Sequence, residues 1–292
     1  IFVDPLVLFY NRDLYTNAGL VAVPANWSAV IKNHTALTRL GERGVVLQSD
    51  LAFGTADNIV HAKDILALLI LQAGSPLVAY DQPTGSYRAI LNYAPGVTDK
   101  VSPAGAALDF YTAFANPLAI TYSWNESLPL DQTQFAAGKL IHYFGYASEE
   151  EEVRMRNPNL NLDLTLVPQR DNIGRNLTLG RLTGLALSRG ATDPTSAYAV
   201  LRLLAGPVYA ARLAAAADLP PVRRDLLARP TTGLFQDVYI RSAIIAKSWL
   251  DPERAGSQAI LADMIRAKNT GRLQTSSIVG TAGEKLNRLL AR

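Results

Sequence analysis

The chain has 292 residues, of which 49% are hydrophobic and 18% charged, a composition typical of folded globular proteins. It has no cysteine, which excludes disulfides, thiol catalysis and cysteine-ligated metal centres. Its three histidines are widely spaced and its net charge of +3 comes from scattered residues, so we expect neither a His-x₃-His metal helix nor a nucleic-acid surface. No apolar run reaches the roughly 18 residues that a membrane-spanning helix needs.

The first half of the chain predicts strands that alternate with helices. The helix that ends at Gly74 is apolar on every side, which indicates burial. Ser102-Pro103 is a cap followed by proline at the first helical position. The expected elements are a strand over 6–10, a helix from Trp27, a strand over 45–47, a helix from Asp57 or Asn58, a polar stretch over 80–101 with a turn at 81–85, a helix from Pro103 to Phe114, a short helix over 131–138 and a strand over 140–144.

The second half predicts a few strands and then mostly helices. Ser148 and Glu151 fit a capping box for a short helix, and the acidic run 149–152 suits that helix's positive first turn better than cation binding. Further expected elements are strands over 162–166, 177–179 and 182–187, and helices from Pro194, Pro207, Leu234, Asp251 and Ser276. The order of elements indicates an α/β fold, and the length suggests about two domains.

The motif search yields no specific catalytic signature. The chain has no phosphate-binding loop, no Gly-x-Gly-x-x-Gly and no Gly-x-Ser-x-Gly elbow. His142 lies inside a predicted strand, which favours a structural histidine. Spacing alone does not identify a pair of acids for glycoside hydrolysis.

Aromatic residues provide the candidate binding residues. Trp124 lies in a polar, loop-like segment, Tyr146 follows a strand, and Trp249 precedes a helix. Such rings can stack on the C–H face of a sugar, although each can equally pack against the core. Trp27 opens a helix with apolar spacing, so we expect it in the core.

Several segments, read in order, resemble the extracellular solute-binding proteins of ABC importers in the maltose-binding-protein-like branch. Residues 8–15 (LFYNRDLY), followed by Ala18-Gly19, Pro24 and Trp27, resemble that family's "YN-(K/R)-D-L-(F/Y)…AG…P-x-T-W" stretch. Residues 135–140 (FAAGKL), 166–169 (LVPQ) and the C-terminal segment from Met264 resemble later family segments, so the likeness covers nearly the whole chain.

The resemblance implies a two-lobed, type II periplasmic-binding-protein-like α/β fold, with ligand held between the lobes. It implies that residues 5–166 plus 235–292 form the C-terminal-type lobe, and that 1–4 plus 168–232 form the remainder of the N-terminal-type lobe. The family begins with further βα units, so we expect the first lobe to be incomplete here. The implied protein is extracellular or periplasmic and anchored through an absent N-terminal region, as lipoproteins are.

The implied function is capture of a carbohydrate for ABC transporter permease subunits, without cofactor, metal or catalysis. The lobes are expected to close by a hinge near Asp4-Pro5 and Pro168. Asp4 corresponds to an acidic contact of the family, and Tyr146 to a stacking position, so we expect Tyr146→Ala to weaken binding without affecting folding. The expected ligand-binding residues are Asp4, Tyr10, Gln48, Phe53, Trp124, Tyr146 and Trp249.

Two alternatives stay open. The chain can be a carbohydrate-active hydrolase, which would release reducing ends from its substrate. It can also be a scaffold domain with a non-functional cleft. A binding protein, in contrast, is stabilised by its sugar and leaves it unchanged.

Overall fold

The computed structural model describes residues 1–92, 102–171, 174–230 and 233–291. The strands are β1 (Phe2–Asn11), β2 (Arg39–Leu40), β3 (Val46–Leu51), β4 (Val78–Asp81), β5 (Ser86–Ala89), β6 (Leu140–Tyr146), β7 (Leu162–Thr165), β8 (Thr178–Thr183) and β9 (Ala246–Lys247). The α-helices are α1 (Arg12–Asn17), α2 (Trp27–Leu37), α3 (Ala62–Gln72), α4 (Pro103–Ala113), α5 (Asp131–Ala136), α6 (Glu150–Arg156), α7 (Pro194–Leu204), α8 (Pro207–Ala216), α9 (Arg224–Leu227), α10 (Gln236–Ile245), α11 (Arg254–Asn269) and α12 (Thr275–Leu290). Two short 3₁₀ turns are η1 (Glu42–Gly44) and η2 (Ala147–Glu149).

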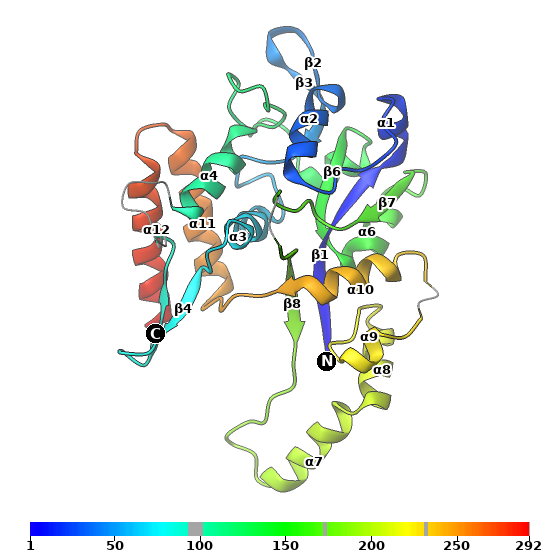
Figure 1. Cartoon of the computed structure of the whole chain (residues 1–292), viewed down its shortest axis with the longest axis vertical. Coiled ribbons are helices and arrows are strands. Elements are labelled where there is room, and N and C mark those ends of the chain that lie inside the picture. The colour runs from blue at the N-terminus through cyan, green and yellow to red at the C-terminus, as the bar shows by residue number, and fades with distance from the viewer. Residues whose placement is uncertain (93–101, 172–173, 231–232, 292) are drawn as a thin grey trace.

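One mixed sheet organises the fold, with β1 at its centre (Figure 1). The strand order is β2-β3-β6-β1-β8-β9, and β7 also pairs with β1. β3 and β6 are parallel, as are β8 and β9, whereas β1 runs antiparallel to β6, β7 and β8. The α/β class expected from the sequence is therefore confirmed.

β1 changes partners along its length. Residues 2–5 pair with β8, residues 6–10 pair with β6, and residues 8–11 pair with β7 on the other edge. Residues 3–9 are all buried, which explains why this strand is an almost unbroken apolar run rather than an alternating one. The strand therefore links two groups of elements.

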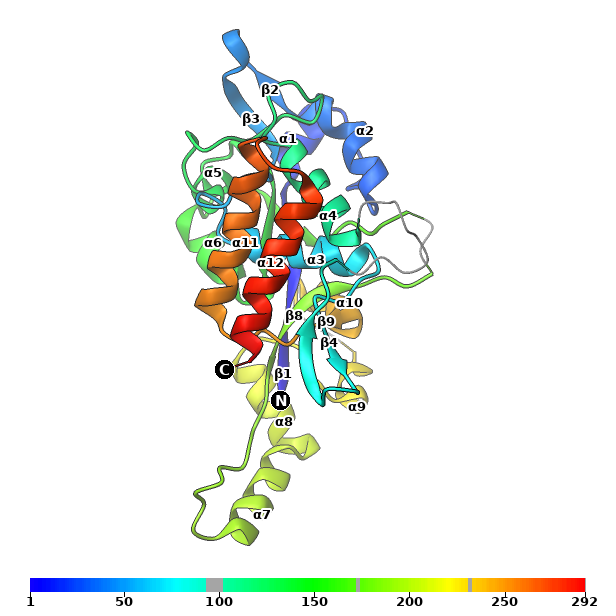
Figure 2. The same cartoon turned by 90° about the vertical axis from the view of Figure 1, so that its left-hand side faces the viewer.

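Four helices pack together beside the sheet. α3 contacts α4 and α11, and α12 packs against α11 and α4. Figure 2 shows α11 and α12 side by side, with α4 next to them. Leu66, Leu68 and Ile70 of α3 are fully buried, so the prediction of a buried helix is confirmed. Gly74, at φ +94°, follows the helix in the left-handed conformation that favours glycine.

The segment from the end of β8 to α9 extends away from this core (Figure 1). None of the residues of α7 is buried. Exposed apolar side chains gather along it, including Leu182, Tyr198, Val200, Leu203 and Val208. In the described residues no single helix is long and apolar enough to cross a membrane, although α7 and α8, bent by 67°, pass that test as a pair.

Most predicted elements are confirmed, and three predictions are wrong. The Ser102 side chain caps α4 as expected, accepting a hydrogen bond from the Gly105 amide at 3.1 Å. The Ser148 side chain instead donates to Asp4, so the expected capping box is absent. One strand, β8, replaces the two expected over 177–187. The polar stretch contains the β4–β5 hairpin around the expected turn, and its last part, 93–101, lies outside the described residues.

The third correction concerns the start of α3. The sequence predicts a helix from Asp57 or Asn58, but α3 begins at Ala62, with His61 at its N-cap.

The residues around Pro168 contact the regions of α2 and α3. The Pro168 carbonyl accepts a hydrogen bond from the Gln72 side chain at 2.9 Å, and Gln169 forms an isolated bridge with Asn26. This part of the chain therefore stays beside α2 and α3. β8 then leads from this region into the protruding segment.

Candidate functional site

The carboxyl ends of the parallel strands β3 and β6 define the candidate site. After β3 the chain leads through residues 52–61 into α3, and after β6 it leads through η2 into α6. Ligands of α/β proteins bind at this edge of a sheet, because the loops and helix N-termini that follow the strands converge there. Polar and charged side chains gather at this edge, and we call them the charged cluster: Asp4, His61, Lys63, Asp64, Ser148, Glu149, Arg181 and Asp251.

His61 lies between two carboxylates. Its Nε2 is 2.6 Å from Oε1 of Glu149, and its Nδ1 is 3.8 Å from Oδ2 of Asp64. Burial lowers the pKa of His61, but the contacts with Asp64 and Glu149 outweigh it and raise that pKa to about 9. The Tyr143 hydroxyl donates to Oε2 of Glu149 at 2.6 Å. The imidazolium is thus an anchored cation at neutral pH.

Arg181 of β8 joins this group to the crossing strands. Its Nη2 donates to Oδ2 of Asp64 at 3.0 Å, and its guanidinium carbon lies 3.5 Å from the centroid of the Tyr146 ring. Burial raises the pKa of Asp64, whereas His61, Arg181 and Lys63 lower it to about 2. Asp64 is therefore ionised, and Arg181, 36% exposed, forms the outer surface here.

Asp4 is buried beside this group. Its two carboxylate oxygens accept hydrogen bonds from the amide and the hydroxyl of Ser148, at 3.1 and 2.7 Å. Burial raises the pKa of Asp4, and these hydrogen bonds offset part of the rise. Since Asp4 lies on β1 and Ser148 follows β6, the contact ties the central strand to the candidate site.

A groove of about 320 Å³ adjoins the charged cluster between α3 and α11. Lys63 lies on its wall and donates to Oδ2 of Asp251 at 2.7 Å. Arg266 donates from Nε to Oδ2 of Asp57 at 3.0 Å. The groove is lined by Ala56, Asp57, Ile59, Val60, Ala62, Lys63, Ala255, Gln258, Ala259, Ala262 and Arg266.

The cationic side chains described at this edge all contact carboxylates. Lys63, Arg181 and Arg266 each contact a carboxylate. The edge therefore offers hydrogen-bond donors and acceptors without a surplus of positive charge, which suits hydroxyl groups that donate and accept at once. Among the residues that the structure describes, no group of three or more His, Asp or Glu side chains is arranged to hold a metal ion.

The structure brings some of the sequence-predicted residues to this edge and leaves others apart. Asp4 and Tyr146 belong to it, and Trp249, partly buried against the core, precedes the Asp251 that pairs with Lys63. Tyr10 lies on the other half of β1 and donates to Asp163 at 2.9 Å. The Gln48 side chain donates to the Leu37 carbonyl at 2.8 Å.

Three predicted aromatic residues are not open stacking surfaces. Phe53 and Trp124 have no exposed surface and belong to the hydrophobic core, where Trp124 Nε1 donates to Asn58 at 3.1 Å. The Phe53 ring packs against the rings of Tyr111, Phe114 and Phe144, and neither Phe53 nor Trp124 reaches the surface. Tyr146 is also fully buried, because Arg181 covers its ring and the His61 ring packs edge-on at 5.1 Å.

The sequence analysis did not predict the polar site residues at the start of α3 and on β8. His61, Lys63 and Asp64 interrupt an otherwise apolar segment at the helix N-terminus, and that interruption was the available signal. Arg181 and Gln258 carry no such signal, since isolated basic and amide residues are common on surfaces. Their role at this edge follows only from the way that β8 and α11 pack.

The two remaining histidines form a separate buried network. Asp50 accepts hydrogen-bond contacts from Nδ1 of His34 at 2.9 Å and Nδ1 of His142 at 2.7 Å, and Nε2 of His142 is 2.7 Å from the Tyr15 hydroxyl. Burial raises the pKa of Asp50, but the two histidines outweigh it and lower that pKa. His142 is a satisfied structural histidine, as predicted.

Comparison with known proteins identifies the fold. No family model and no curated protein sequence matches the chain. Solved structures do match: a cyclo/maltodextrin-binding protein complexed with maltotetraose has a TM-score of 0.75 at 15% identity, over 98% of this chain and 69% of that one. An ABC transporter solute-binding protein from Thermotoga lettingae bound with α-D-tagatose has a TM-score of 0.66 at 15% identity, over 99% and 71%. UgpB from Mycobacterium tuberculosis with glycerophosphocholine has 0.68 at 15%, over 100% and 70%.

These likenesses define the class of fold. The chain has the α/β fold of the solute-binding proteins of ABC transporters, in the maltodextrin-binding type, and it spans about 70% of the length of the matched chains. The fold expected from the resemblance of the sequence is thus confirmed. The matched structures are those of binding proteins.

Proposed function

We propose that the protein is the solute-capturing component of an ABC importer and binds an uncharged carbohydrate at the charged cluster and the adjoining groove. The pairing of Lys63, Arg181 and Arg266 with carboxylates carries this proposal. A sugar hydroxyl donates to a carboxylate while it accepts from a neighbouring cation, so paired charges suit it. A phosphate, in contrast, is recognised by cations that are free to bind it.

Two of the residues predicted from the sequence offer groups to the sugar in this proposal. Asp4 supplies a carboxylate at the junction of β1 and β6, and Trp249 supplies an aromatic ring beside Asp251. Gln258 is exposed on the groove wall, where its amide is available for a hydroxyl group. Tyr146 acts indirectly, because its ring packs against the guanidinium of Arg181 and holds it in place.

The proposal includes the two lobes and their closure. Residues 5–166 plus 235–292 form one lobe, and residues 1–4 plus 168–232 belong to the other. The change of partner in β1 between residues 5 and 6 and the absence of buried residues in α7 support this division. The boundary at Thr232 lies outside the described residues. Closure about β1 and β8 would bury the ligand, and X-ray scattering would detect it as compaction.

The partners follow from the proposed role. A solute-capturing component delivers its ligand to the permease subunits of the importer, and it lies on the outer side of the membrane. The lobe surfaces that flank the bound ligand are the ones that face the permease.

Calorimetry and thermal denaturation test the function. We expect maltotetraose, maltotriose or tagatose to bind and to raise the melting temperature, whereas glycerophosphocholine does not. We expect Gln258→Ala to weaken sugar binding by about two- to tenfold, the cost of one hydrogen bond. The matched control is Gln82→Ala, an exposed glutamine in the β4–β5 hairpin, which leaves binding unchanged.

Two results would contradict the proposal. Binding of glycerophosphocholine without any sugar would overturn the uncharged ligand class, and no response to a wide sugar panel would overturn sugar capture. An assay for new reducing ends separates capture from hydrolysis, because a binding protein returns its oligosaccharide intact.

A further inference from the structure

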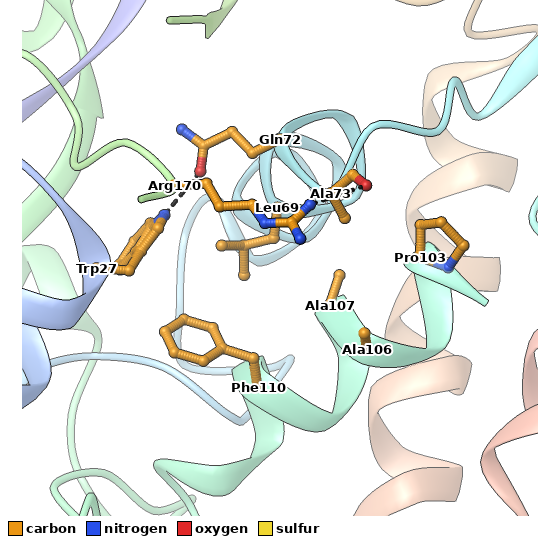
Figure 3. A pocket seen from close by; sticks show the side chains of 9 residues that line it. All are labelled: Trp27, Leu69, Gln72, Ala73, Pro103, Ala106, Ala107, Phe110 and Arg170. Atoms are coloured by element: carbon orange, nitrogen blue, oxygen red, sulfur yellow. Dashed lines mark hydrogen bonds between the residues drawn. The ribbon is translucent and has the colours of Figure 1, made fainter. Parts of the chain in front are cut away.

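A second cavity lies at the other end of α3 from the candidate site. It has a volume of about 390 Å³, within the range of small-molecule pockets. It opens between the last turn of α3, the first turns of α4, the start of α2 and the segment that follows Pro168 (Figure 3). Since α3 begins at the charged cluster and ends here, the two sites are separated by the length of an 11-residue helix, about 16 Å.

The walls of this cavity are apolar and include two aromatic rings. The centroids of Trp27 and Phe110 are 5.3 Å apart, with their planes at 71°. Figure 3 shows these two rings on one side, Leu69 above and Ala106 and Ala107 across from them. The indole Nε1 of Trp27 already donates to Oε1 of Gln72 at 2.7 Å, so this wall offers a ligand no free indole donor.

Among the described residues that line the cavity, Arg170 is the one cation. Arg170 is exposed, and its Nη1 donates to the Ala73 carbonyl at 3.3 Å (Figure 3). In the part of the chain that the structure describes, Arg170 forms no ion pair, and the neighbouring Asp171 carboxylate accepts from Ser28 instead. The first turn of α4, which begins at Pro103, lies on the same cavity and adds the positive end of a helix dipole.

We propose that this cavity binds a small aromatic carboxylate. The ring of the ligand lies against Trp27 and Phe110, and its carboxylate pairs with the guanidinium of Arg170. The aromatic walls favour a ligand that carries an aromatic ring, because edge-on and offset contacts between rings are favourable. Arg170, which forms no ion pair with any described residue, accounts for the charge, because a guanidinium binds a carboxylate through two parallel hydrogen bonds. This site does not depend on the proposed capture of sugar.

A matched pair of fluorinated probes tests the proposal. We would follow 4-fluorophenylacetate and 4-fluorophenylacetamide by ¹⁹F NMR, since they differ in charge and hardly in shape. We expect the carboxylate to bind the protein at least about tenfold more tightly than the amide, as a charge-assisted hydrogen bond provides. Equal affinities, or no binding of either probe, would overturn the proposal.

Two variants localise the binding. We expect Arg170→Gln to reduce the affinity for the carboxylate about tenfold and to leave that for the amide unchanged. We expect Ala106→Leu, at an exposed position of α4, to fill the cavity and abolish binding of both probes. Their controls are Arg272→Gln and Ala36→Leu, at exposed positions that do not line the cavity. Full binding by Ala106→Leu, or equal loss in the controls, would place the probe elsewhere and refute the assignment.

Discussion

The guanidinium carbon of Arg181 lies 3.5 Å from the centroid of the Tyr146 ring, while the same side chain donates to Asp64. This contact joins β8 to the carboxyl end of β6 and to the start of α3. It also covers the ring on which a sugar would otherwise stack. Tyr146 therefore supports Arg181, and the exposed group at this place is the guanidinium.

Substitution of Tyr146 tests that role. We expect Tyr146→Ala to lower the free energy of unfolding by about 3–5 kcal/mol, the cost of removing a buried aromatic ring. We expect Tyr146→Phe to change it by less than about 1 kcal/mol, because the buried hydroxyl has no hydrogen-bond partner among the described residues. Chemical denaturation measures both values, and Tyr198→Ala, at an exposed tyrosine of α7, is the control. Unchanged stability with lost sugar affinity in Tyr146→Ala would restore the stacking role.

The charged state of His61 predicts a loss of stability in mild alkali. Burial opposes the charge, but Asp64 and Glu149 raise the pKa of His61 to about 9, above its ordinary value of 6.5. The folded state therefore holds this proton more tightly than the unfolded chain. Its contribution, about 3 kcal/mol for that shift, is complete below pH 6.5 and is lost as the pH rises through about 9. Urea denaturation at a series of pH values should show this decline, and His61→Gln should lack it. An identical decline in the variant would assign it to another group.

The raised pKa of Asp131 predicts a second change of folding stability with pH, at lower pH than that of His61. Burial raises the pKa of Asp131 to about 6, against the opposing effect of hydrogen bonds from the Val60 and Gln132 amides. Because the folded pKa exceeds the ordinary 3.8, this group favours folding most below pH 3.8, and that contribution is lost as the pH rises through about 6. We expect Asp131→Asn, which keeps an acceptor oxygen for both amides, to remove this part of the pH profile and to be more stable than the natural protein at pH 7. Lower stability of the variant at pH 7 would contradict this reading.

Gly54 and Gly74 form a matched pair of positive-φ glycines. Gly54 has φ +98°, and a Cβ there would lie 2.7 Å from the backbone nitrogen of Ala115, whereas Gly74 has φ +94° and open space around it. We expect Gly54→Ala to cost about 2–5 kcal/mol, since strain adds to a backbone clash, and Gly74→Ala to cost about 1–2 kcal/mol. Thermal and chemical denaturation would measure the difference. Equal costs would mean that the segment after β3 moves away from Ala115, in the turn after α4, without penalty.

Sequence patterns predicted the elements well because their causes are local. The apolar run of β1, the Ser102-Pro103 start of α4 and the glycine that ends α3 all act within a few residues. The aromatic site residues were harder to predict. Phe53 and Trp124 lie outside the regular elements, and nothing local indicates that Phe53 packs against Tyr111 of α4 or that Trp124 is buried beside Asn58.

The sequence by itself determined the α/β class, the buried character of α3 and the likeness to solute-binding proteins, because hydrophobic period, caps and ordered motifs are properties of short segments. The tertiary structure decided which polar groups meet. Asp4, His61, Asp64, Glu149 and Arg181 come from four separate parts of the chain, and only the pairing of β1 with β6 and β8 brings them to one edge. Burial and neighbouring charges then set their pKa values, and those depend on distances in space that residue spacing does not encode.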